Sequence, residues 1–410
     1  MHKLGSFLAL ALVTLVVVLA AIYVQRGPDE TIIEERLLFP GLSEKLNRIA
    51  QVRISKGESV VELRRQGENA WSVPDRTEYP ADLAKIHELL LGTAGLERLE
   101  QKTSNPERYG QLGLAEVVSE EKGAMQITIQ DEEGQSLADF FLGKRGMAKG
   151  RRARDEMYVR IRDEPVVWLV EGNLPYGNKI TDWLQKDILT LDQARIRGVR
   201  ITHPDGEEVI VRRNDREATN YQLIGLPEAA EPKSVYAINS IASSMANLQL
   251  QDVHSIKDLD LSVGKTGAKV LLTTFDGMRI TMETWQIDED IFVRINAGFD
   301  AALVHAEPKR NELQGEQDSL QGKEKTIEIA DAKKDENITK IQPSQPKWND
   351  TKSVEKEANT LYARWRNWAY ILPKYQLNNI TKRMSDLIKE PTAKSDHTAA
   401  NNQRAEEPTR

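Results

Sequence analysis

The residues with the clearest chemical meaning form a basic run between two predicted strands. Clustered ammonium and guanidinium groups attract anions, so this loop favours lipid headgroups, a polyanionic glycan or an acidic partner. A solvated hairpin tip is the alternative interpretation. The candidates for binding an anion or partner are the loop residues and one arginine of the next strand: Lys144, Arg145, Lys149, Arg151, Arg152, Arg154 and Arg160.

A second candidate surface combines aromatic and basic residues near the C-terminus. Trp365, Trp368 and Tyr370 lie in the stretch 362–370, which also contains two arginines. The alternation predicts a strand with these aromatics either in the core or in contact with sugar rings or the membrane interface.

No catalytic constellation emerges from the remaining motifs. Gly264-Lys265-Thr266 lacks the upstream glycine of a phosphate-binding loop, since Leu259 stands there. Ser353-Val354-Glu355-Lys356 has Ser-x-x-Lys spacing without its usual partner motifs. No two histidines have the i,i+4 spacing of a zinc helix, and there is no cysteine. We therefore expect no catalytic residues, no metal site and no cofactor.

Net charge argues against nucleic acid as a partner. The 410-residue chain carries a formal charge of −7, whereas nucleic-acid binding needs a basic balance or a long basic face. The length allows two or three domains.

An uncharged apolar run from Leu4 to Val24 predicts a membrane anchor. At about 1.5 Å per residue, a helix of this length crosses the hydrocarbon core of a bilayer. The run exceeds the core of a signal peptide, although a cleaved signal remains the alternative. Lys3 favours a cytoplasmic N-terminus. In a Gram-negative cell we therefore expect a single-pass protein of the bacterial inner membrane, with the bulk of the chain in the periplasm.

The body repeats one pattern twice. Asn47–Ile54 and Gln193–Ile201 open the two copies, and Met157–Ile161 matches Ile291–Ile295. Each copy combines alternating strands, turns that contain glycine and an amphipathic helix. The predicted fold is α+β: a transmembrane helix followed by two tandem copies of a mostly antiparallel sheet with one principal helix.

The two copies differ in charge at the same hairpin. The basic loop of the first copy corresponds to Asp288, Glu289 and Asp290 in the second. The second copy also contains a charged insert, whose composition predicts disorder or a loose charged helix. The predicted segments are a cytoplasmic N-terminus 1–3, the transmembrane helix 4–24, a linker 25–45, a first lobe 46–190, a second lobe 191–390 with the insert 307–357, and a disordered tail 391–410.

The chain resembles the family of single-pass bacterial proteins called domain of unknown function 4340. The resemblance rests on the anchor, Trp71 with Pro74, Tyr109-Gly110 with Leu114, Tyr158-Val159-Arg160, and Trp183 with Leu189. It implies association with ABC-type export systems and gliding-like auxiliary proteins, and it transfers no functional residues. We therefore expect a non-enzymatic accessory protein that contacts a permease or auxiliary subunits, with a glycan- or anionic-lipid-binding module as the alternative. The sequence leaves the oligomeric state open.

Overall fold

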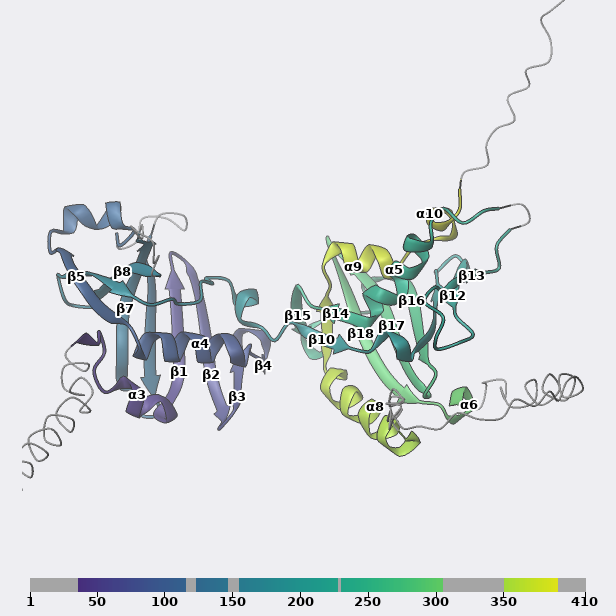
Figure 1. The fold of residues 1–410 in the computed structure, drawn as a ribbon, viewed down its shortest axis with the longest axis horizontal. Helices are drawn as coiled ribbons and strands as arrows, with labels where there is room; N and C mark the ends of the chain where they lie inside the picture. Colours follow the sequence, from purple (N-terminus) through teal and green to yellow (C-terminus); the bar gives the residue numbers. More distant parts are fainter. Residues whose placement is uncertain (1–35, 116–122, 147–154, 228–229, 305–349, 390–410) are drawn as a thin grey trace, which may run out of the picture. The chain divides into compact units, whose positions relative to one another are not determined.

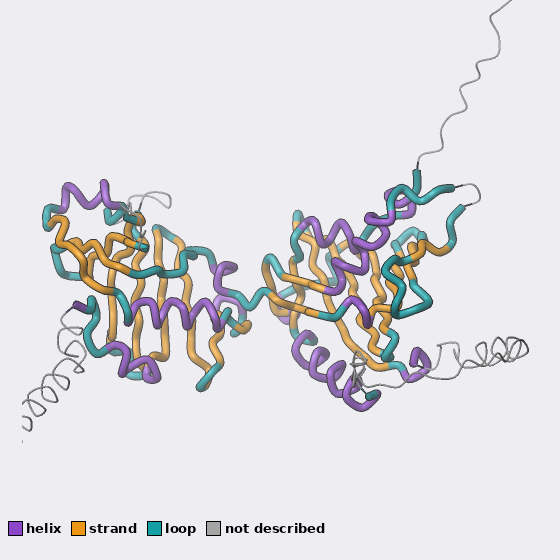
Figure 2. Tube along the Cα trace, in the orientation of Figure 1, coloured by secondary structure: helices purple, strands orange, loops and turns teal. Residues whose placement is uncertain are grey.

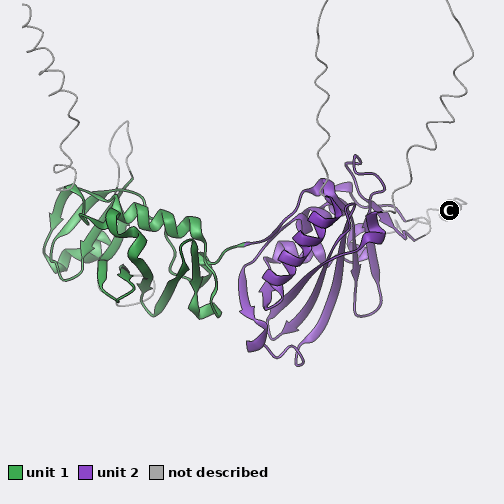
Figure 3. Ribbon diagram, turned by 90° about the horizontal axis from the view of Figure 1, so that it is seen from below, with its two compact units in different colours: residues 1–186 green, residues 187–410 purple. Residues whose placement is uncertain are grey.

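The computed structural model describes residues 36–115, 123–146, 155–227, 230–304 and 350–389. The chain divides into two compact units, one up to Lys186 and one from Asp187 onward (Figure 3). Strands dominate both units (Figure 2). The mixed α/β composition with antiparallel sheets that the sequence predicts is confirmed.

Unit 1 is a strongly twisted antiparallel sheet with one long helix on a face (Figure 1). The strands lie in the order β4-β3-β2-β1-β6-β7-β8-β9-β5. Its elements are α3 (Leu42–Lys45), β1 (Ile49–Lys56), β2 (Ser59–Gly67), β3 (Ala70–Val73), β4 (Tyr79–Pro80), α4 (Leu83–Ala94), β5 (Glu97–Thr103), β6 (Met125–Asp131), β7 (Ser136–Arg145), β8 (Glu156–Ile161) and β9 (Val167–Glu171).

Local sequence explains where α4 begins and what it buries. The Asp82 side chain accepts a hydrogen bond from the backbone N–H of Lys85, which caps the first turn. Ile86, Leu89 and Leu90 share one face at helical spacing and are buried. The strands follow the same logic with period two, because β6 alternates strictly between buried and half-buried residues.

Unit 2 has a sheet of order β13-β12-β11-β16-β17-β18-β19-β15 and a separate pair of strands, β10 and β14. Its elements are β10 (Asp187–Thr190), β11 (Ile196–Thr202), β12 (Glu208–Arg212), β13 (Gln222–Ile224), α5 (Val235–Ala246), β14 (Asn247–Gln249), β15 (Asp252–Ser255), β16 (Lys265–Thr274), β17 (Met278–Ile287), β18 (Asp290–Phe299), α6 (Ala301–Val304), α8 (Thr351–Trp365), β19 (Trp368–Ile371), α9 (Lys374–Ile380) and α10 (Met384–Leu387).

The two sheets have the same strand order once β4 is set aside, since β1 corresponds to β11, β6 to β16 and β9 to β19. The correspondence extends to an irregularity of the register. The β1–β6 pairing shifts between Ile49 and Gln51, and the β11–β16 pairing shifts between Ile196 and Gly198. In unit 1 the strand after the long helix, β5, pairs with the last strand, β9. In unit 2 the second strand after α5, β15, likewise pairs with the last strand, β19.

Three predicted boundaries need correction. The linker was predicted to extend to residue 45, but Leu38 and Leu42 are buried in unit 1, and α3 contacts β7. The predicted insert 307–357 ends too late, because residues from Thr351 belong to α8 and Val354 is fully buried. The first lobe was predicted to reach residue 190, yet β10 pairs with β14 of unit 2.

The predicted anchor Leu4–Val24 and the tail 391–410 lie outside the described residues, as does most of the insert. Within the described ranges, no helix is both long and apolar enough to cross a bilayer.

Candidate functional site

A cavity of about 560 Å³ lies in unit 1, where the end of β7 meets the segment after β5. Two lysines line it, Lys56 at the end of β1 and Lys144 near the end of β7. Met125 and Leu142, which are cross-strand partners of β6 and β7, supply apolar surface. The described lining residues are Lys56, Gly110, Gly113, Ala115, Gly123, Met125, Leu142, Gly143, Lys144 and Tyr176.

Close backbone packing shapes one wall of this cavity. A Cβ atom at Gly143 would lie 2.4 Å from the carbonyl oxygen of Leu112, so only glycine lets β7 approach the short helix Pro106–Leu112. The Lys144 Nζ donates a hydrogen bond of 3.1 Å to the carbonyl oxygen of Gln111. The chain path therefore fixes the position of this ammonium group.

Tyr176 also lines this cavity. Its hydroxyl donates a hydrogen bond of 2.6 Å to the carbonyl oxygen of Gly143. Burial raises the pKa of the Tyr176 phenol, and the Arg145 guanidinium offsets part of that effect. The phenol therefore stays protonated at neutral pH and holds the loop after β9 to the end of β7.

A second hollow, of about 420 Å³, is also lined by Tyr176. Arg145 lines it and donates a hydrogen bond of 3.0 Å to the Asn173 side-chain oxygen. Its lining carries both signs of charge, because Lys85 and Arg145 are accompanied by Asp82 and Glu88. The two hollows are therefore electrostatically different.

The structure separates the residues predicted to bind an anion. Lys144 and Arg145 are exposed and line the two hollows, whereas Lys149, Arg151, Arg152 and Arg154 lie outside the described residues. Arg160 is 5% exposed, with its guanidinium 4.4 Å from the ring centroid of Phe141 and 5.0 Å from that of Tyr109. Its position corrects the prediction that it extends the basic surface, because these rings cover it.

The predicted aromatic contact surface is mostly core. Trp365 is fully buried and donates from its indole N–H to the carbonyl oxygen of Ile188 at 3.3 Å. Tyr370 is 1% exposed, and Trp368 is half-buried on β19. The stretch also does not form one strand, because the residues up to Trp365 belong to α8. Trp365 and Tyr370 therefore cannot stack on sugar rings in this fold.

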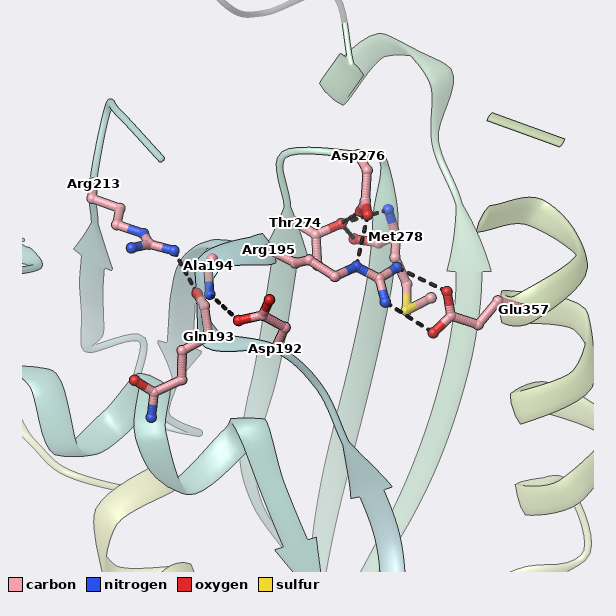
Figure 4. Close-up of polar contacts among 9 residues, drawn as sticks. All are labelled: Asp192, Gln193, Ala194, Arg195, Arg213, Thr274, Asp276, Met278 and Glu357. Carbon is pink, nitrogen blue, oxygen red and sulfur yellow. Dashed lines mark hydrogen bonds and ion pairs between the residues drawn. The ribbon is translucent and has the colours of Figure 1, made fainter. Parts of the chain in front are cut away.

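The densest polar cluster of unit 2 holds α8 against the sheet (Figure 4). Arg195 donates through Nε to Asp276 at 2.7 Å and through both terminal nitrogens to Glu357 of α8, at 3.0 and 2.8 Å. Burial works against the charge of Arg195, but the hydrogen bonds to Glu357 and Asp276 outweigh it and raise its pKa. We call this group the Arg195 clamp.

Unit 1 contains a simpler version of the same arrangement. Arg48 precedes β1 as Arg195 precedes β11, and it lies 3.2 Å from Asp131 and 3.7 Å from Glu133 in the β6–β7 turn. Asp131 accepts the backbone N–H of Gln135, just as Thr274 accepts that of Met278 in the β16–β17 turn. We interpret the Arg195 clamp as structural, because Arg195 donates to Asp276 and Glu357 and these contacts join α8 to the sheet.

Among the described residues, no group of histidines and carboxylates is arranged to hold a metal ion. Lys56 and Tyr176 escaped the sequence analysis because they come from distant parts of the chain. The sequence signal at Tyr176 is the segment Leu174-Pro175-Tyr176, which indicates a turn and not a cavity wall.

Residues 71–264 match the family model described as Domain of unknown function (DUF4340). Over this segment the chain belongs to the DUF4340 family. The match confirms the predicted family, and it runs from β3 of unit 1 to the residue before β16 of unit 2. Comparison with curated proteins and with solved structures found no match.

Proposed function

We propose that this DUF4340 protein is a membrane-anchored, non-enzymatic accessory subunit of an ABC-type export or motility-like system. It would be fixed to the inner membrane by Leu4–Val24 and present both units to partner proteins in the periplasm. The apolar run and the flanking Lys3 support the location, and the family resemblance supports the kind of system.

The proposal rests on one observation: the two units share a strand order but carry opposite charges at an equivalent connection. We infer that they arose by duplication, because the order of the strands and the β1–β6 register shift recur in unit 2. At the β7–β8 connection unit 1 exposes Lys144 and Arg145. At the equivalent β17–β18 turn unit 2 exposes Asp288, Glu289 and Asp290. Opposite charges at one structural position suit a protein that holds two different partner surfaces.

The test is co-purification of the full chain from membranes with the permease subunits of an ABC-type exporter. We expect K144E/R145E and D288K/E289K/D290K each to reduce recovery of a different partner. Lys45→Glu and Glu132→Lys are matched controls, because both change the charge of exposed residues away from these connections. Recovery of permease subunits that is unaffected by both charge reversals would overturn the proposal.

A second candidate function is binding to an anionic membrane surface, which Lys144 and Arg145 favour because both are exposed at one end of unit 1. The full chain should then sediment with phosphatidylglycerol vesicles more than with phosphatidylcholine vesicles at low salt. The K144E/R145E variant should lose that preference. An equal preference in the variant and the wild type would exclude this function for the described basic residues.

A further inference from the structure

The cavity beside Tyr176 differs from the other hollow of unit 1 in the sign of its charge. Lys56 and Lys144 line it, and none of its described lining residues is an aspartate or glutamate. In the second hollow lined by Tyr176, carboxylates accompany the cations. Described walls that carry lysines and no carboxylate favour an anion, since a neutral or cationic occupant leaves their charge unbalanced.

The two ammonium groups have donors to offer. Among the residues that the structure describes, Lys144 Nζ has one hydrogen-bond acceptor, the carbonyl oxygen of Gln111, and an ammonium has three N–H donors. Lys56 makes no ion pair with any other described residue. An anion between them would gain charge-assisted hydrogen bonds, which are about twice as strong as neutral ones.

The remaining surface of the cavity suits an apolar group. Ala115, Met125 and Leu142 contribute hydrocarbon, and the glycines expose backbone without side chains. The volume of about 560 Å³ falls within the range of small-molecule sites, which are mostly apolar with a few placed polar groups. The cavity therefore has room for more than an inorganic ion.

The equivalent place in unit 2 is closed. His203 follows β11 where Lys56 ends β1, and it is 7% exposed. Its Nε2 lies 3.2 Å from the carbonyl oxygen of Lys382, so the C-terminal segment covers this position. The open cavity is thus a specific property of unit 1 and not a consequence of the shared topology.

We infer that the unit 1 cavity binds a small amphipathic anion, a phosphate or carboxylate head on a short apolar body, with Lys56 and Lys144 at the head. The inference goes beyond the proposed function, because it concerns a small ligand and needs no protein partner. A lipid fragment and a soluble phosphate ester both carry an anionic head on an apolar body. The experiment therefore compares ligands that have the anionic head, the apolar body or both.

The experiment is calorimetric titration of the purified full chain with hexyl phosphate, hexanoate, inorganic phosphate and hexanol. We expect saturable binding of hexyl phosphate or hexanoate at one site per chain, and at least about tenfold weaker binding of inorganic phosphate and hexanol. Hexyl phosphate bound more tightly than hexanoate would identify a phosphate head, and the reverse order a carboxylate. Equal binding of inorganic phosphate and hexyl phosphate would overturn the apolar half of the inference.

Variants locate the binding. K56Q/K144Q should weaken hexyl phosphate binding at least about tenfold, because each change removes a charged donor. Gly110→Leu should block binding by filling space, since a Cβ there meets only Ala115 at 4.0 Å. Lys269→Gln, an exposed lysine of unit 2, is the matched control and should bind normally. Wild-type binding by K56Q/K144Q, or no binding of any probe, would refute the inference, and neither result bears on permease co-purification.

Discussion

At the scale of single residues, the Arg195 clamp shows how a buried cation is balanced. The Arg195 and Asp276 side chains are 12% and 5% exposed, whereas that of Glu357 is 33% exposed. Arg195→Met should therefore lower the free energy of unfolding of unit 2 by about 3–5 kcal/mol, because Asp276 keeps its burial and loses its cation. Glu357→Gln should cost about 1 kcal/mol, since its partner retains Asp276.

Chemical denaturation of the full chain, followed by hydrogen exchange in unit 2, measures both effects. Arg200→Gln is the control, because the Arg200–Glu208 pair is 49% and 43% exposed and should contribute at most about 0.5 kcal/mol. Similar losses for Arg195→Met and Arg200→Gln would show that burial does not govern the clamp.

Residue type alone could identify some of the candidate site and not the rest. Lys144 was predicted because charge in a loop is visible in the sequence, and it lines the cavity. Arg160 belongs to the same basic sequence but lies under Phe141 and Tyr109, which come from other segments. The sequence records the charge of a residue, whereas its burial depends on segments that approach from far along the chain.

At the scale of elements, the repeated turns offer an internally controlled experiment. Gly134 in the β6–β7 turn and Gly277 in the β16–β17 turn have φ of +77° and +94°, which favours glycine. A Cβ at Gly134 would meet nothing within 4 Å, whereas one at Gly277 would lie 2.7 Å from the Phe299 ring.

Gly134→Ala should therefore cost about 1 kcal/mol of backbone strain in unit 1. Gly277→Ala should cost about 3 kcal/mol in unit 2, because overpacking adds to the strain. Denaturation with a hydrogen-exchange readout for each unit measures the difference. Equal costs would mean that Phe299 and its neighbours give way without penalty.

The C-terminal segment should detach in acid. Arg383 pairs with Asp205 at 2.8 Å, and Lys389 pairs with Glu231 at 2.7 Å. A backbone hydrogen bond from Glu207 and the hydrogen bond from Arg383 lower the pKa of Asp205, and the hydrogen bond from Lys389 lowers that of Glu231. A lowered folded-state pKa stabilises the fold above the unfolded value, and the stabilisation disappears as pH falls through the folded value.

Amide exchange in residues 383–389 should accordingly rise below about pH 4, relative to the intrinsic rate at each pH. The D205N/E231Q variant should show raised exchange already at neutral pH and little further increase in acid. The same acid response in the variant and the wild type would assign the change to other groups.

Helix α8 shows where element prediction fails. The alternation of 362–370 favoured a strand, and the charged composition before it favoured disorder or a loose charged helix. In the structure Asp350 caps a helix whose buried Val354, Ala358 and Trp365 lie at helical spacing. Because only three buried apolar residues lie on this otherwise polar helix, its periodic signal in the sequence is weak. Packing against β18 supplies the stabilisation that the helix propensity of the segment does not. Strands with strict alternation, such as β6, were predictable because each carries its own signal.

At the scale of the whole molecule, the two units should respond separately to core substitutions. Ile54 of β1 and Ile201 of β11 occupy equivalent positions and are 1% and 0% exposed. Ile54→Ala should destabilise unit 1 by about 2–5 kcal/mol, and Ile201→Ala should do the same to unit 2. Hydrogen exchange resolved by segment should show lost protection in the substituted unit alone. If either substitution lowered hydrogen-exchange protection in both units, the two units would unfold as one cooperative body.

The shared topology has a consequence for synthesis on the ribosome. In unit 1 only residues 162–166 separate β8 from β9, so the last strand of the sheet is synthesised soon after β8 leaves the ribosome. In unit 2 the strand between β18 and β15 is β19, which begins only at Trp368. A nascent chain that has already produced Phe299 must leave the edges of β18 and β15 unpaired while the residues up to Ile371 are translated. The long connection also raises the entropy cost of closing the sheet. The second unit is therefore the one that most needs protection from misfolding before it is complete.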